Sequence, residues 1–89
     1  MIKALAWALR QHPDKVNSLE KLVLVVLADM ATNDGMVNAL KYKVARNACL
    51  DIDELEDVLS HLIEKGFIKE ARDYVETNDT TVIYKLIVV

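Results

Sequence analysis

Acidic side chains crowd into one short stretch, and they are the most distinctive chemistry of this chain. The stretch runs DIDELED, with carboxylates at Asp51, Asp53, Glu54, Glu56 and Asp57. In the first turn of a helix, one or two acids are each favourable by roughly 0.3–1 kcal/mol. Asp53 and Asp57, however, are like charges four residues apart, which is unfavourable on a helix. The stretch is therefore either a plain solvated acidic face or a surface that attracts a basic partner.

Catalytic chemistry is poorly supported by the same region. Asp57 and His61 are spaced by four residues, but Ser60 points elsewhere on a helix and no oxyanion motif accompanies them. The two glycines lie far apart, so no phosphate-cradling loop exists. His12 and His61 have no companion Cys or His at metal-ligand spacing. We therefore expect no enzymatic activity, no cofactor and no metal site.

Basic side chains flank the acidic stretch in the sequence. They could hold a phosphate backbone from the side, although ordinary surface charge is the simpler interpretation. Lys85 is a further basic residue in the C-terminal segment. The candidate nucleic-acid-binding residues are Lys41, Lys43, Arg46, Lys69 and Arg72. The candidate residues for contact with a basic protein partner are Asp53, Glu54, Glu56, Asp57 and His61.

The distribution of charge argues against conventional DNA binding. The net charge is −3. Residues 1–50 carry seven Lys/Arg and four Asp/Glu, whereas residues 51–89 carry four Lys/Arg and ten Asp/Glu, giving +3 and −6. Because phosphate contacts dominate affinity for DNA, a DNA-binding domain usually has a basic surface. The chain as a whole lacks that excess of positive charge.

Length and composition predict one folded domain over residues 1–89. The chain is 53% hydrophobic with two Gly and one Pro, which is typical of a globular core. A single cysteine, Cys49, excludes an internal disulfide and favours a reducing compartment; we expect it to be a buried small side chain. No secretion signal or membrane span is recognisable, so we expect a cytoplasmic protein of a bacterium or a phage-infected cell, without membrane contact.

Helical periodicity dominates the first two thirds of the chain. Residues 1–12 predict a short helix ended by Pro13, and its Trp7 could anchor a homodimer. Asn17 or Ser18 is expected to cap a second helix; with Asn17 as the cap, Glu20 lies at the position that completes a capping box. Residues 33–35 predict a turn. The expected apolar stripe of the first helix is Ile2, Leu5, Ala6 and Leu9. That of the second helix is Leu19, Leu22, Val23, Val26, Leu27 and Met30.

Two further helices and a β-hairpin complete the expected fold. A third helix covers about 40–48, and a fourth, capped by Asp51 or Asp53, runs to Lys65 before Gly66 in the left-handed conformation. Residues expected to face inward are Leu40, Val44, Ala45, Leu55, Val58, Leu59, Leu62 and Ile63. Strands are expected at 67–75 and 80–89, with a turn at 76–79. The fold class is therefore α+β, mainly α: a winged helix-turn-helix with a helical core at 17–66 and a hairpin wing at 67–89.

Three segments carry a resemblance to a known family. They are WALRQ at 7–11, SLEKLVLVVLADMATNDG at 18–35 and VLSHLIEKGFI at 58–68. Together they resemble the helix-turn-helix domains of phage replication initiators of the lambda O type and related replisome organisers. The resemblance covers most of residues 5–72. It implies a winged-helix, DNA-binding module of phage or mobile-element type that acts in replication or transcription control.

The chain departs from that family where DNA would be read. Members that read DNA usually start the recognition helix with small polar residues and arginine, whereas this chain has the acidic stretch at 51–57. Like charges facing each other cost several kcal/mol, so major-groove docking is not expected. Any DNA contact would come from the flanking basic residues. The alternative is a protein-binding viral inhibitor or adaptor, of the anti-CRISPR or polymerase-binding type, that presents an acidic helix to a basic partner.

Overall fold

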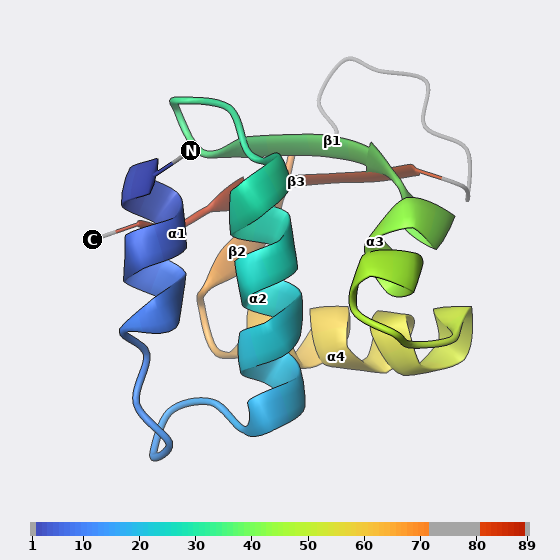
Figure 1. The fold of residues 1–89 in the computed structure, drawn as a ribbon, viewed down its shortest axis with the longest axis horizontal. Coiled ribbons are helices and arrows are strands. Elements are labelled where there is room, and N and C mark those ends of the chain that lie inside the picture. Colours follow the sequence, from blue (N-terminus) through green and yellow to red (C-terminus); the bar gives the residue numbers. More distant parts are fainter. Residues whose placement is uncertain (1, 72–80, 89) are drawn as a thin grey trace.

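The computed structural model describes residues 2–71 and 81–88, and within them the protein has an α+β fold (Figure 1). The elements are α1 (Ile2–Leu9), α2 (Ser18–Met30), β1 (Met36–Leu40), α3 (Lys41–Asn47), α4 (Ile52–Glu64), β2 (Ile68–Glu70) and β3 (Thr81–Leu86). Figure 1 shows α1 and α2 side by side, with α4 across the lower end of α2. The predicted fold class of α+β, with helices predominating, is confirmed.

The three strands form one antiparallel sheet in the order β1-β3-β2. β3 is central: Met36 of β1 pairs with Lys85, and Ile68 of β2 pairs with Leu86. β2 and β3 pair as the predicted C-terminal hairpin. β2 begins at Ile68 and ends at Glu70, and β3 ends at Leu86, before the predicted end of that strand. Residues 72–80, which contain the predicted turn at 76–79, lie outside the described residues.

The predicted helical core at 17–66 included no strand, and this was wrong, because β1 lies between α2 and α3. Five residues are too short for a clear alternating pattern, although Val37 is buried and Asn38 is exposed. The strand forms because β3, more than 40 residues later, supplies its hydrogen-bonding partner. Leu40 ends this strand and is 37% exposed, so the inward position predicted for it was also wrong. Val44 and Ala45 of α3 are buried as predicted.

The stripe predicted for α1 was displaced, whereas that predicted for α2 was correct in part: Val23 and Leu27 are buried, and Val26 and Met30 pack against the core. In α1, Ala4, Trp7 and Ala8 are buried, whereas Leu9 is 54% exposed. This register brings two small alanines and one large ring to the interface with the rest of the fold. In α2 the buried apolar residues are Val23, Leu24, Leu27 and Ala28, while Leu19 and Leu22 are 36% and 41% exposed. Both corrections show that the stripe follows the positions of neighbouring elements, which periodicity alone does not give.

The termini of the core helices follow local rules closely. Asn17 and Glu20 form the predicted capping box of α2, with reciprocal bonds of 2.8 and 2.9 Å. Gly66 has φ +82°, which confirms the predicted left-handed position after α4. Cys49 has φ +57° in the turn between α3 and α4, and its side chain is exposed, so the prediction of a buried thiol was wrong. Its place in a tight turn, outside either helix, explains the exposure.

No helix in the described part of the chain is both long enough and apolar enough to cross a membrane.

Candidate functional site

The N-terminal cap of α4 fixes where the helix begins, and the core determines which of its faces is buried. Asp51 caps α4: its side chain accepts from the Glu54 N–H at 2.8 Å, and Glu54 accepts from the Asp51 N–H at 3.3 Å. The inner face is apolar and buried, with Leu55, Val58, Leu59 and Leu62. Ile63 was predicted to be buried with them but is 36% exposed, because it lies at the edge of this stripe. The remaining side chains of α4 are turned to solvent.

The carboxylates in the first half of this helix differ in the interactions that they make. Glu54 serves the capping box, and Glu56 pairs with the Lys41 ammonium at 3.3 Å. The side chains of Asp53 and Asp57 are exposed and have no hydrogen bond or ion pair with any other residue that the structure describes. We call Asp53, Glu56 and Asp57 the acidic face. Its unpaired charges are available to a partner, since no side chain of the described protein neutralises them.

The predicted basic residues differ in their surroundings. Lys41 is committed to Glu56, and the Lys85 ammonium donates to the Asp34 carbonyl at 3.1 Å. Lys43 and Arg46 on α3 and Lys69 on β2 are exposed, and both elements pack against α4. Arg72 lies outside the described residues.

His61 belongs to a second group of polar side chains, at the C-terminal end of α4. This group consists of Glu20, His61 and Lys65, and we call it the clamp. The Glu20 carboxylate is buried, with its side chain 3% exposed. It accepts from the Lys65 ammonium at 2.6 Å and from the Asn17 N–H at 2.9 Å, while His61 Nδ1 lies 3.9 Å away. The clamp therefore ties the start of α2 to the end of α4.

The clamp also sets the ionisation of its carboxylate. Burial of Glu20 raises its pKa, but the hydrogen bonds from Lys65 and Asn17 and the positive charges of Lys65 and His61 outweigh burial and lower the pKa below its ordinary value of 4.5. Glu20 is thus held as a carboxylate, as a buried charge with strong partners should be. Sequence reasoning identified Glu20 only as a capping residue, because its bond to Lys65 spans 45 positions.

A shallow hollow of about 170 Å³ adjoins the acidic face between α4 and the sheet. The residues around it are Lys41, Glu56, Leu59, Ser60, Ile63, Glu70 and Tyr84. Glu56 and Glu70 bring two carboxylates to this hollow, against the single ammonium of Lys41. Sequence reasoning missed Ser60, Ile63 and Glu70 as surface residues of one site, because β2 must first be placed beside α4. The net charge of the hollow suits a basic group.

The residues expected to be without catalytic or metal-binding partners lie in separate places. Within residues 2–71 and 81–88, no three His, Cys, Asp or Glu side chains lie close enough to hold a metal ion. Ser60 and His61 line different surroundings, the hollow and the clamp.

Comparison of the chain with protein-family models, with curated proteins and with solved structures finds no match. The resemblance to phage replication initiators therefore stays a prediction from the sequence.

Proposed function

We propose that this chain is a winged-helix domain in which α4 occupies the position of the recognition helix. Three observations support the proposal: α3 and α4 are joined by a tight turn, the C-terminal hairpin β2–β3 follows α4, and β1 adds to the edge of that hairpin. Helix-turn-helix domains use the second helix of such a pair as their contact surface. α1 is then an addition before the core.

The domain acts, on this proposal, by binding a protein with a basic surface and not by reading the major groove of DNA. The observation that carries the proposal is the exposed pair Asp53 and Asp57, which has no partner in the described residues. The partly exposed Ile63 and the hollow beside it add apolar surface, so a basic side chain of a partner can bury its stem as well as pair its charge. The resemblance noted above makes proteins of DNA replication or transcription the expected class of partner.

The test uses a labelled synthetic peptide of alternating arginine and alanine, measured by fluorescence anisotropy. We expect salt-sensitive binding by the wild-type chain. The double variant Asp53→Lys with Asp57→Lys should weaken it by about tenfold or more, because attraction becomes repulsion. The matched control is Asp14→Lys with Asp29→Lys, which changes the net charge equally at two exposed acids outside α4. It should retain affinity within about twofold.

Equal weakening by both variants would show attraction to net charge alone, and would contradict a specific surface on α4. Absence of peptide binding by the wild-type chain at low salt would contradict the proposal outright.

Direct contact with DNA is the second candidate function, favoured by the exposed side chains of Lys43, Arg46 and Lys69. None of the three has a side-chain partner in the described residues. If they grip phosphates, affinity for a random-sequence duplex falls steeply as salt rises, and Lys43→Glu with Arg46→Glu removes it. If the chain binds a basic protein instead, the wild-type chain should not bind that duplex even at low salt. Binding at low salt would favour direct contact with DNA over protein binding.

A further inference from the structure

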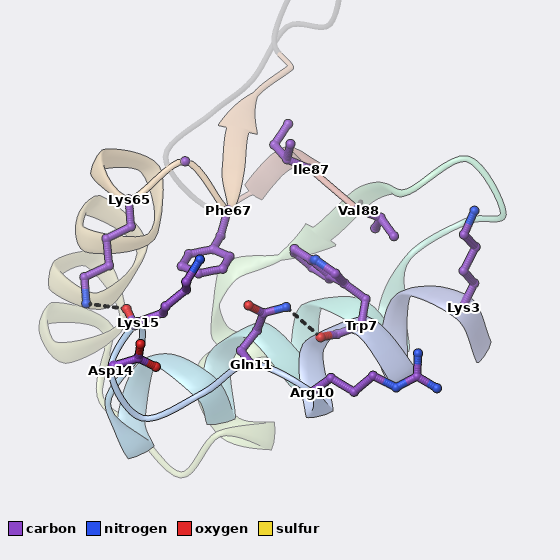
Figure 2. Close-up of a pocket in the computed structure, with 11 residues that line it drawn as sticks. Lys3, Trp7, Arg10, Gln11, Asp14, Lys15, Lys65, Phe67, Ile87 and Val88 are labelled. Atoms are coloured by element: carbon purple, nitrogen blue, oxygen red, sulfur yellow. Dashed lines mark hydrogen bonds between the residues drawn. The ribbon is translucent and has the colours of Figure 1, made fainter.

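A larger groove, of opposite charge, lies beyond the other end of α4. It has a volume of about 670 Å³, within the range of ligand-binding pockets. α1, the loop that follows it, the turn after α4 and residues 87–88 form its walls (Figure 2). The groove begins at Lys65, eight residues after Asp57. One helical residue advances about 1.5 Å, so the nearest residues of the two surfaces are roughly 12 Å apart along the helix axis. The groove is thus separate from the acidic face.

Aromatic and aliphatic side chains form the apolar part of this groove. Trp7 and Phe67 are in tilted contact, with ring centroids 6.1 Å apart, and Ile87 and Val88 lie beside them. The Trp7 backbone carbonyl accepts from the Gln11 amide at 2.8 Å, which fixes the end of α1 against the groove.

Trp7 also brings an unused hydrogen-bond donor to this surface. The residue is 6% exposed, and its indole N–H donates to no acceptor in the described residues. No polar side-chain atom there is both fully buried and without a partner, so the indole nitrogen keeps some contact with solvent. A buried indole N–H usually finds an acceptor. The Trp7 indole N–H, without an acceptor among the described residues, can therefore donate to a ligand.

The rim of the groove is cationic. Lys3, Arg10 and Lys15 are exposed, and their side chains have no partner in the described residues. Lys65 is already held by Glu20 at 2.6 Å and by the Lys15 carbonyl at 3.1 Å. Among the described residues that line the groove, Asp14 is the one carboxylate, so their three free cations against one acid leave a net charge of +2.

We propose that this groove binds an acidic segment of a protein partner. An apolar side chain of the segment lies against the half-buried Phe67, Ile87 and Val88. An acceptor of the segment takes the Trp7 indole N–H, and its carboxylates pair with Lys3, Arg10 and Lys15. Charge complementarity selects an anionic occupant. The burial of Trp7 selects a peptide over a nucleic acid, since a base needs an open aromatic face on which to stack. This site goes beyond the function proposed for α4, because it lies on another surface and takes a partner of opposite charge.

The test exploits the fact that Trp7 is the only tryptophan of the chain, so its emission reports directly on the groove. The probe is a short peptide of Asp and Glu with one central leucine, titrated into the full chain at low salt. We expect a saturable change of Trp7 emission. The same peptide with serine in place of leucine should bind more weakly, and a peptide with lysine in place of the acids should give no change.

Two variants locate the contact. Lys3→Glu with Arg10→Glu should weaken binding of the acidic peptide by about tenfold or more, whereas Lys43→Glu with Arg46→Glu, an equal charge change on α3, should leave it within about twofold. Trp7→Phe keeps an aromatic ring but removes the N–H, and should weaken binding of labelled peptide a few-fold by anisotropy. Asp53→Lys with Asp57→Lys should have no effect, which separates this test from that of the acidic face.

Three results would overturn the proposal. The first is no response to the acidic peptide, or a response that the Lys3 and Arg10 reversal does not weaken. The second is quenching of Trp7 by a single-stranded oligonucleotide at lower concentration than the peptide requires, which would assign the groove to nucleic acid. The third is a change of Trp7 emission with protein concentration alone, matched by dimer formation in sedimentation, which would assign it to a second copy of the chain.

Discussion

The exposed carboxylates on α4 and the carboxylate of Glu20, which packs against the end of α4, are chemically alike but differ in their surroundings. In the clamp, Glu20 is buried and receives hydrogen bonds from Lys65 and the Asn17 N–H. On the acidic face, Asp53 and Asp57 are exposed without partners among the described residues. A buried charge needs partners, because removing it from water is costly. An exposed pair of like charges needs no partner, although its repulsion lowers stability slightly.

This difference separates charges that hold the fold from charges that are available for binding. The clamp joins α2 to α4, and its loss should be felt in the free energy of unfolding. Among the described residues, the side chains of the acidic face make one ion pair, between Glu56 and Lys41, and it is near the surface. Changes to Asp53 and Asp57 should be felt chiefly in binding.

The largest effect on stability is expected from Glu20→Ala. The change removes the bonds to Lys65 and Asn17 and should lower the free energy of unfolding by roughly 2–3 kcal/mol, below the value for a fully buried pair because Lys65 is partly exposed. Urea denaturation measures it. Asp29→Ala on the same helix, at an exposed position, should stay within about 0.5 kcal/mol. If both variants lose the same stability, the clamp is not a structural contact.

Acid should weaken the protein through the same carboxylate. Because the pKa of Glu20 is lower in the folded state than its ordinary value of 4.5, the stabilisation is complete above that value and is lost as the pH falls through the folded pKa. Urea denaturation at a series of pH values below about 5 should show this decline. Glu20→Gln should show a shallower one, since its side chain does not titrate. Parallel pH curves for the two proteins would contradict the clamp as the source.

Lys41→Ala should change binding by the acidic face more than it changes stability. Loss of a surface ion pair costs about 0–1 kcal/mol, so stability should change little. The freed Glu56 makes the acidic face more negative, and affinity for the arginine-alanine peptide should rise about twofold to threefold. Anisotropy titration measures this, with Lys43→Ala as the control for lost positive charge. Equal gains in both variants would mean that net charge and not the acidic face sets the affinity.

The smallest effect is expected from Asp57→Asn. It removes the repulsion from Asp53 one turn away and should raise the free energy of unfolding by about 0.2–0.5 kcal/mol. It should at the same time weaken binding of the basic peptide. Denaturation at low and high salt tests the cause, because screening should abolish the gain. A loss of stability would show that Asp57 has a structural role.

Local chemistry explains which parts of the fold could be predicted. The capping box of Asn17 and Glu20, the turn glycine Gly66 and the hairpin each depend on residues close in sequence, and each was found. β1 was missed because its partner strand β3 is far along the chain. The stripe of α1 was misplaced because the burial of Trp7 depends on Phe67, 60 positions later.

The sites divide along the same line. Periodicity placed Asp53, Glu56 and Asp57 outward on one helix, since one segment determines them. The role of Glu20 in the clamp, and the groove around Trp7, could not be seen in advance, because each joins elements from both halves of the chain. Such long-range contacts leave no local signal in a single sequence.

The most direct test of the central claim is a backbone-amide NMR titration of the full chain with the arginine-alanine peptide, followed by a random-sequence DNA duplex. We predict that the peptide changes the chemical shifts of the α4 backbone amides between Asp53 and Ser60. The duplex should change none at the same concentration. Peptide-induced shifts scattered over the chain, or duplex-induced shifts at Lys43, Arg46 and Lys69, would contradict it.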